Sequence, residues 1–87
     1  MKVHYHNNFI KSYKKRILYS VVLDNKFKER LKMFIENSQS PVLKDHVLKD
    51  TKIGYRAFSI TGDIRVIYEK VDDGILLHDI GTHNQDY

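Results

Sequence analysis

Histidine, aspartate and arginine residues lie close to strand-forming stretches in the second half of the chain. His46 occurs in LKDHVL, which we expect to be a loop just before the sheet. Asp63 and Arg65 are two residues apart in GDIRV, at the expected start of a strand, so both should point to the same side. His83 follows the apolar run GILLHDI. Histidine titrates near neutral pH, so it can accept or donate a proton. The planar guanidinium of arginine matches the oxygens of a phosphate group. These residue types suit the cleavage of a phosphodiester bond.

RNA is the substrate that such a set fits, because its own 2′-hydroxyl serves as the nucleophile and no cofactor is needed. The reaction requires a base, an acid and cations that stabilise the charge growing on the phosphate. Arg56 supplies a second cation, and we expect it to lie toward the same region of adjacent strands as Arg65 if TGD forms the turn between them. Tyr87 supplies an aromatic ring that can stack on a base.

Metal chemistry has weaker support. His4 and His6 are two residues apart in a short alternating stretch, so they could form a metal-binding pair, but two exposed strand residues explain them more simply. The chain has no zinc-binding signature and no cysteine, which excludes thiolate metal sites and disulfides. His78 lies inside an apolar strand, as a packed or hydrogen-bonded histidine does. We therefore expect no metal site.

The net charge of +4 is unevenly distributed. Residues 1–36 hold nine Lys or Arg against three acids, a balance of +6, whereas residues 37–87 hold six against eight, a balance of −2. A basic front half suits a polyanion or an acidic protein partner, although from charge alone a solvated helix surface is the simpler explanation. Since no stretch approaches the roughly 20 apolar residues of a membrane span and the first residues lack a signal-peptide pattern, we expect a cytoplasmic protein without membrane contact.

The first half of the chain has a helical pattern. A short strand is predicted at 2–5, a helix capped by Asn7 or Asn8, and a second helix from about Lys26 to Asn37. Apolar residues recur along both helices at the spacing of one helix face. They are Phe9, Ile10, Tyr13 and Ile17 in the first helix and Phe27, Leu31, Phe34 and Ile35 in the second.

The second half favours strands. After Pro41, the stretches YRAFSI, IRVIYEKV and GILLHDI are rich in β-branched and aromatic residues and are separated by the turn sequences TGD and DDG. The element order βααβββ predicts a single α+β domain over residues 1–87. We expect a two-layer sandwich in which a helical hairpin packs on one face of a small antiparallel sheet. The other face is then left for function, and Gly81 is expected to let the chain turn after the last strand.

The second half also resembles a known family. LKDHVLKD, GYRAFSITGDIRVIYEK and ILLHDIGTHNQDY are similar to segments of the RelE/ParE superfamily of bacterial toxins, and within it to the YafQ-like mRNA interferases. The resemblance implies a small α+β sandwich. It further implies a ribosome-dependent endoribonuclease that cleaves mRNA, inhibits translation and is neutralised by a cognate antitoxin.

The resemblance also assigns residues. It implies that two histidines transfer protons, that an aspartate tunes or shares one of these transfers, that two arginines stabilise the transition state, and that a terminal aromatic holds the base. These positions fall on His46 and His83, Asp63, Arg65 and Arg56, and Tyr87.

Three positions depart from the family pattern, and two other functions stay open. Ser59 replaces a strand histidine of the YafQ branch, Ile64 replaces a tryptophan, and Phe58 stands where RelE has a lysine. Which histidine is the acid and which the base is therefore left undecided. The alternatives are a non-catalytic toxin that binds gyrase, like the ParE branch, and a plain RNA-binding module. A toxin that acts by binding alone does not need a convergent His/Asp/Arg set.

Overall fold

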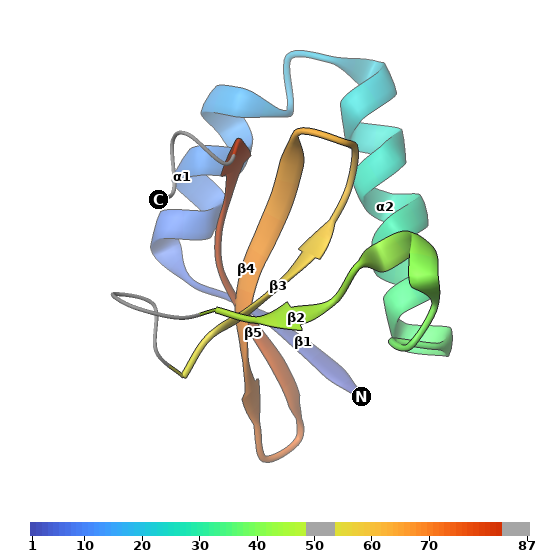
Figure 1. The fold of residues 1–87 in the computed structure, drawn as a ribbon. Helices are drawn as coiled ribbons and strands as arrows, with labels where there is room; N and C mark the ends of the chain where they lie inside the picture. Colours follow the sequence, from blue (N-terminus) through green and yellow to red (C-terminus); the bar gives the residue numbers. More distant parts are fainter. Residues whose placement is uncertain (49–53, 83–87) are drawn as a thin grey trace.

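The chain folds into two helices packed on a five-stranded sheet, an α+β architecture (Figure 1). The computed structural model describes residues 1–48 and 54–82. In chain order the elements are β1 (Lys2–Tyr5), α1 (Asn7–Arg16), α2 (Val21–Glu36), the 3₁₀ helix η1 (Pro41–Leu43), β2 (His46–Val47), β3 (Arg56–Ser59), β4 (Ile64–Val71) and β5 (Gly74–Thr82).

The sheet has the strand order β1-β5-β4-β3-β2. The predicted meander of three strands is confirmed, since β3 pairs antiparallel with β4 and β4 with β5. The prediction of a purely antiparallel sheet is wrong in one respect, because β1 pairs in parallel with the first half of β5. A short strand that the sequence analysis did not predict, β2, pairs with β3 and extends the other edge.

Both helices begin at positions other than those predicted. His6, rather than an asparagine, caps α1, because its Nδ1 accepts a hydrogen bond of 3.0 Å from the backbone N–H of Asn8. Helix α2 starts at Val21 rather than near Lys26. The hydroxyl of Ser20 accepts from the backbone N–H of Leu23 at 3.2 Å, and this cap adds more than a turn to the helix.

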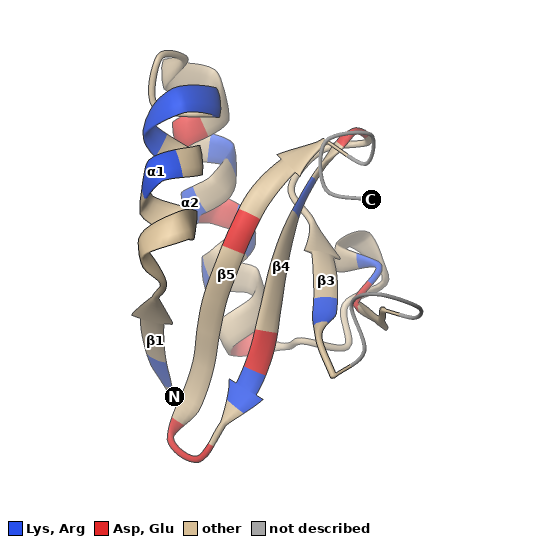
Figure 2. Cartoon of the chain, turned by 90° about the vertical axis from the view of Figure 1, so that its left-hand side faces the viewer, with Lys and Arg blue, Asp and Glu red and all other residues tan. Residues whose placement is uncertain are grey.

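The main core lies between the helices and one face of the sheet (Figure 2). The rings of Phe34, Phe58 and Tyr68 meet at its centre, with centroids 4.7–5.7 Å apart. Not all of the predicted apolar positions are inside, since Ile10 and Ile35 are exposed. No helix in the described residues is long and apolar enough to cross a membrane.

Strand β5 is longer than the sequence predicted. Gly81 does not turn the chain: it lies within the strand opposite Arg65, and Thr82 pairs with Ile64. The paired end of β5 therefore extends to the turn that precedes β4.

The contact between β1 and β5 generates a stability prediction. A Cβ atom added at Gly74 would lie 1.8 Å from the backbone oxygen of Lys2. Gly74→Ala should therefore force the strands apart and lower the free energy of unfolding by about 1–3 kcal/mol, measured by urea denaturation. At Gly62 an added Cβ meets nothing within 4 Å, so Gly62→Ala is the matched control. Equal midpoints for the two variants would contradict the prediction.

Candidate functional site

The sheet face opposite α1 and α2, called here the open face, carries a continuous row of side chains from four strands. His46 of β2 pairs with Ala57 of β3, Ala57 with Ile67 of β4, and Ile67 with Asp79 of β5. Residues that pair directly across a sheet project from the same face. The register therefore places His46 and Asp79 at the two ends of one row, with apolar residues between them.

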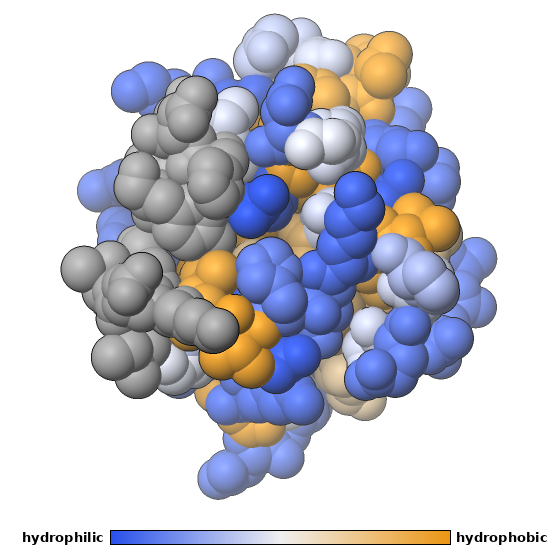
Figure 3. Space-filling model, viewed as in Figure 1, coloured by the Kyte–Doolittle hydropathy of each residue, from blue (hydrophilic) through white to orange (hydrophobic). Residues whose placement is uncertain are grey.

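The middle of the open face has its own small apolar cluster. Leu48 packs on Ala57 and Ile67, all three are buried, and Tyr55 packs against them. On the face that Figure 3 shows, hydrophobic areas lie among hydrophilic side chains. Strand β4 is therefore packed on both sides, which makes it a rigid base for the polar residues around the cluster.

His46 is exposed on β2, whereas the sequence analysis placed it in a loop. Its Nδ1 lies 2.8 Å from the backbone oxygen of Lys44. A carbonyl oxygen only accepts hydrogen bonds, so the neutral imidazole carries its proton on Nδ1 and its lone pair on Nε2. Lys44 has a left-handed backbone, with φ of 49°, which costs free energy in a residue other than glycine. His46 is thus held in the tautomer that can accept a proton at Nε2.

Arg65 projects from the same face as His46. On β4 it precedes Ile67, the member of the row described above, by two residues. Its neighbours across the sheet are Ser59 and Gly81, two small residues. Two strand spacings and two residues along the strand separate the Cα atoms of His46 and Arg65 by roughly 12 Å. This separation lets two long side chains approach a phosphate group from either side.

Asp63 lies in the turn before β4 and is exposed, so it is not a strand residue as the sequence analysis expected. Its backbone N–H donates to the hydroxyl of Thr61 at 3.2 Å. His83 and Tyr87, the other two predicted site residues, lie outside the described residues.

The expectation that Arg56 and Arg65 share a region is wrong. Arg56 pairs with Tyr68, three residues from Arg65 along β4, and therefore projects from the helix-facing side. There its guanidinium donates to the hydroxyl of Tyr68 at 3.2 Å and to the carboxylate of Asp45 at 2.9 Å. The hydrogen bonds to Asp45 and then to Tyr68 raise the pKa of Arg56.

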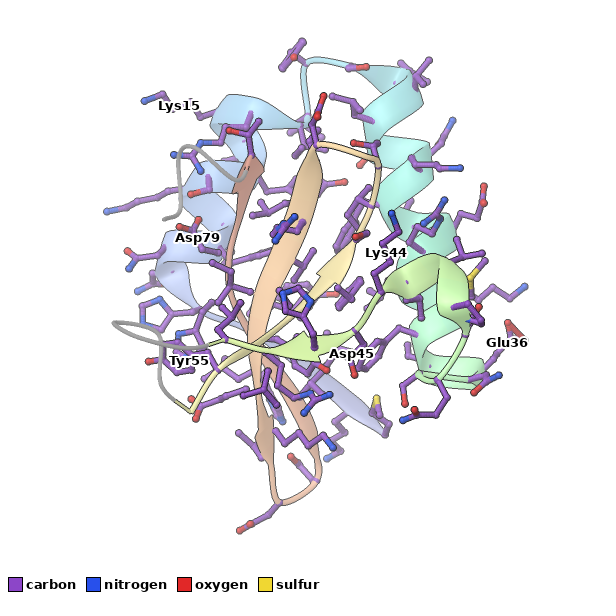
Figure 4. The ribbon with its side chains drawn as sticks, in the orientation of Figure 1. Lys15, Glu36, Lys44, Asp45, Tyr55 and Asp79 are labelled. Atoms are coloured by element: carbon purple, nitrogen blue, oxygen red, sulfur yellow. The ribbon has the colours of Figure 1, made fainter. Side chains whose placement is uncertain are left out.

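Asp45 and Tyr68 are the residues of this region that the sequence analysis missed. The side chain of Asp45 is 9% exposed and accepts from the Tyr68 hydroxyl at 2.5 Å. Burial, followed by this hydrogen bond, raises the pKa of Tyr68. The one available signal was the position of Asp45 directly before His46, because adjacent residues of a strand project from opposite faces. Figure 4 shows Lys44 and Asp45 next to each other where the chain enters β2.

The remaining histidines have structural partners. His78 lies 2.8 Å from Glu69 and stacks on His6, which agrees with the prediction of a hydrogen-bonded histidine. His4 bonds to Asp73 at 2.9 Å, so His4 and His6 have separate partners. Within residues 1–48 and 54–82, no group of three or more histidine, aspartate and glutamate residues could hold a metal ion.

The family of the chain follows from comparison with known proteins. Residues 1–85 match the family model described as the bacterial toxin of type II toxin–antitoxin system, YafQ. The chain belongs to this YafQ family of type II toxins. No curated protein matched the chain in a separate comparison.

Solved structures of similar proteins agree with the family and the fold. YafQ from E. coli strain BL21(DE3) is 27% identical with a TM-score of 0.75, and the match covers 97% of this chain and 94% of that one. The E. coli DinJ–YafQ complex gives the same identity and TM-score over 99% and 97%. A YoeB/ParE toxin from Agrobacterium tumefaciens, 18% identical over 95% and 99%, shares the fold with a TM-score of 0.71.

The buried contact between Arg56 and Asp45 generates a stability prediction. Arg56→Ala leaves the carboxylate of Asp45 without its cation, and it should lower the free energy of unfolding by about 2–4 kcal/mol, because breaking a largely buried pair leaves a charge uncompensated. Lys70→Ala, at an exposed position of β4, is the control and should change little. Denaturant unfolding of both variants measures the difference, and equal losses would contradict the prediction.

Proposed function

We propose that this YafQ-family toxin is an endoribonuclease that cleaves ribosome-bound mRNA by attack of the 2′-hydroxyl, without a metal ion. The observation that carries the proposal is the common face of His46 and Arg65, with Nε2 of His46 in the form that accepts a proton. A base and a phosphate-binding cation on one exposed surface are what this reaction needs.

In the proposed mechanism His46 removes the proton of the 2′-hydroxyl through Nε2. Arg65 lies across the phosphate and stabilises the charge that grows on its oxygens, where a planar guanidinium offers two parallel hydrogen bonds. The acid that protonates the leaving 5′-oxygen is His83, Asp63 tunes one of the two transfers, and Tyr87 stacks on the base. These last three assignments rest on the family resemblance.

The antitoxin is the proposed protein partner. The E. coli relative has been solved as a DinJ–YafQ complex, and this chain, a member of the same family, is proposed to bind a cognate antitoxin of its own. A gyrase-binding function is less well supported. An inhibitor that acts by binding alone does not require His46 and Arg65 to lie on the same face.

Ribosomal RNA is the proposed partner of the helices, where several Lys and Arg positions, blue in Figure 2, lie. Lys11, Lys14 and Lys15 are exposed on α1 and Lys28 on α2. Two other basic residues of this half bind the protein itself. Arg16 donates to the backbone oxygen of Ile80 at 2.9 Å and Arg30 to that of Val42 at 3.2 Å. The proposed contact with RNA therefore depends on the lysines.

The catalytic roles generate the first functional prediction. His46→Ala and Arg65→Ala should each lower the single-turnover rate of mRNA cleavage on programmed ribosomes by about 10²–10³-fold. His4→Ala removes another exposed strand histidine, on β1 at the opposite edge of the sheet, and is the control that should cut normally. Rates within threefold of the parent for Arg65→Ala in a folded protein would exclude its proposed role.

The lysines of α1 generate the second functional prediction. Lys11→Gln combined with Lys15→Gln should weaken ribosome binding and lower the slope of log affinity against log salt by about one to two, because each phosphate contact releases about one counterion. Lys2→Gln combined with Lys70→Gln removes the same charge from exposed positions on the sheet. If both pairs of substitutions change the slope equally, the net charge rather than the face of α1 governs binding.

A further inference from the structure

We propose that Asp45, Tyr68 and Arg56 form a buried hydrogen-bonded network that positions His46 for catalysis. The inference rests on the proposed function, because it treats His46 as the base. It gives Arg56 a positioning role in place of the transition-state-stabilising role that the family resemblance implied.

The network is closed on itself. One carboxylate oxygen of Asp45 accepts from the Tyr68 hydroxyl at 2.5 Å and the other from the Arg56 guanidinium at 2.9 Å. Arg56 also donates to the Tyr68 hydroxyl at 3.2 Å, so each member contacts the other two. A fully satisfied network with low exposure holds its members in one geometry.

The network joins β2 to the rigid core. Tyr68 is 0% exposed and its ring packs edge-on against Phe34 and Phe58. Strand β2 has only two residues, both exposed, and pairs with β3 at the edge of the sheet. A strand of this length has little stability of its own. The bond between Asp45 and Tyr68 therefore supplies an anchor that the ladder of β2 cannot.

The anchor also determines which face His46 occupies. Consecutive residues of a strand project from opposite faces, so a shift of one residue in register would exchange them. Because Asp45 is held toward the helices by Tyr68 and Arg56, the next residue, His46, must project from the open face. The same anchor keeps Lys44 in the left-handed conformation that directs its carbonyl oxygen to Nδ1 of His46.

Two members of the network, Tyr68 and Arg56, stay protonated over the pH range in which histidine titrates. The pKa of Tyr68 and the pKa of Arg56 are both raised, so the hydroxyl stays a donor and the guanidinium stays charged. A change in the pH dependence of cleavage after a substitution in the network would therefore not come from titration of Tyr68 or Arg56.

Tyr68→Phe tests the proposal, since it removes one hydroxyl and leaves the ring in the core. We expect the single-turnover cleavage rate on programmed ribosomes to fall about ten- to a hundredfold, because catalysis is sensitive to small displacements of a reacting group. In a His46→Ala background the same substitution should cost nothing further. Tyr13→Phe is the matched control: it also removes a tyrosine hydroxyl that donates to a carboxylate, that of Asp24, but it lies between the two helices.

A second measurement does not depend on activity. In the free chain, the nitrogen chemical shifts of the His46 imidazole should report the Nδ1-protonated tautomer, and Tyr68→Phe should produce a mixture of tautomers, while Tyr13→Phe should not. An unchanged tautomer, or equal losses of cleavage with and without His46, would overturn the positioning role. If the parent chain cuts no mRNA, the proposed function fails, and the imidazole shifts alone decide whether the network positions His46.

Discussion

The hydrogen bond between the Tyr68 hydroxyl and Asp45 is the point at which the core of this toxin meets its candidate site. The tyrosine ring lies fully buried among Phe34 and Phe58, so its hydroxyl occupies a place that the helices and the central strand determine. Burying a hydroxyl or a carboxylate without a hydrogen-bond partner costs free energy and destabilises the fold. The fold is therefore most stable when Asp45 reaches the Tyr68 hydroxyl. Because His46 follows Asp45 directly, its side chain then projects from the opposite, open face.

Alternation along strands explains what the sequence could and could not predict about the site. The meander and the strand containing Arg65 were visible in the pattern of β-branched and aromatic residues. The register was not, because it depends on how TGD and its flanking residues complete the turn. A register that places Arg56 opposite Tyr68 puts Arg56 and Arg65 on different faces, although both lie near the starts of their strands. Strand β2 was missed because two residues are too few to show any alternation.

Local caps and internal contacts account for the other differences. Valine has a low helix propensity. Val21 and Val22 nevertheless form the exposed first turn of α2, because Ser20 caps this helix. The basic balance of the first half also counts two arginines that bind backbone oxygens of the protein. Nε of Arg30 is buried without a hydrogen-bond partner in the described structure, which fits a residue that joins α2 to the loop and sheet rather than one that meets RNA. A sum of charges does not distinguish these uses.

The two faces of the sheet thus have different roles: one contains the main core and the other carries the candidate site. The helix-facing side contains the large core and the buried network, in which the carboxylate of Asp45, the hydroxyl of Tyr68 and the guanidinium of Arg56 bond to one another. On the open face, the described residues form the small cluster of Leu48, Ala57 and Ile67, and exposed polar residues such as His46 lie beside it. Strand β4 belongs to both clusters, with Tyr68 in the large core and Ile67 in the small one, so we expect a displacement of Tyr68 to affect Ile67 and Arg65 as well. In the proposed mechanism, residues such as Tyr68 and Arg56 therefore affect the geometry of cleavage without touching the RNA.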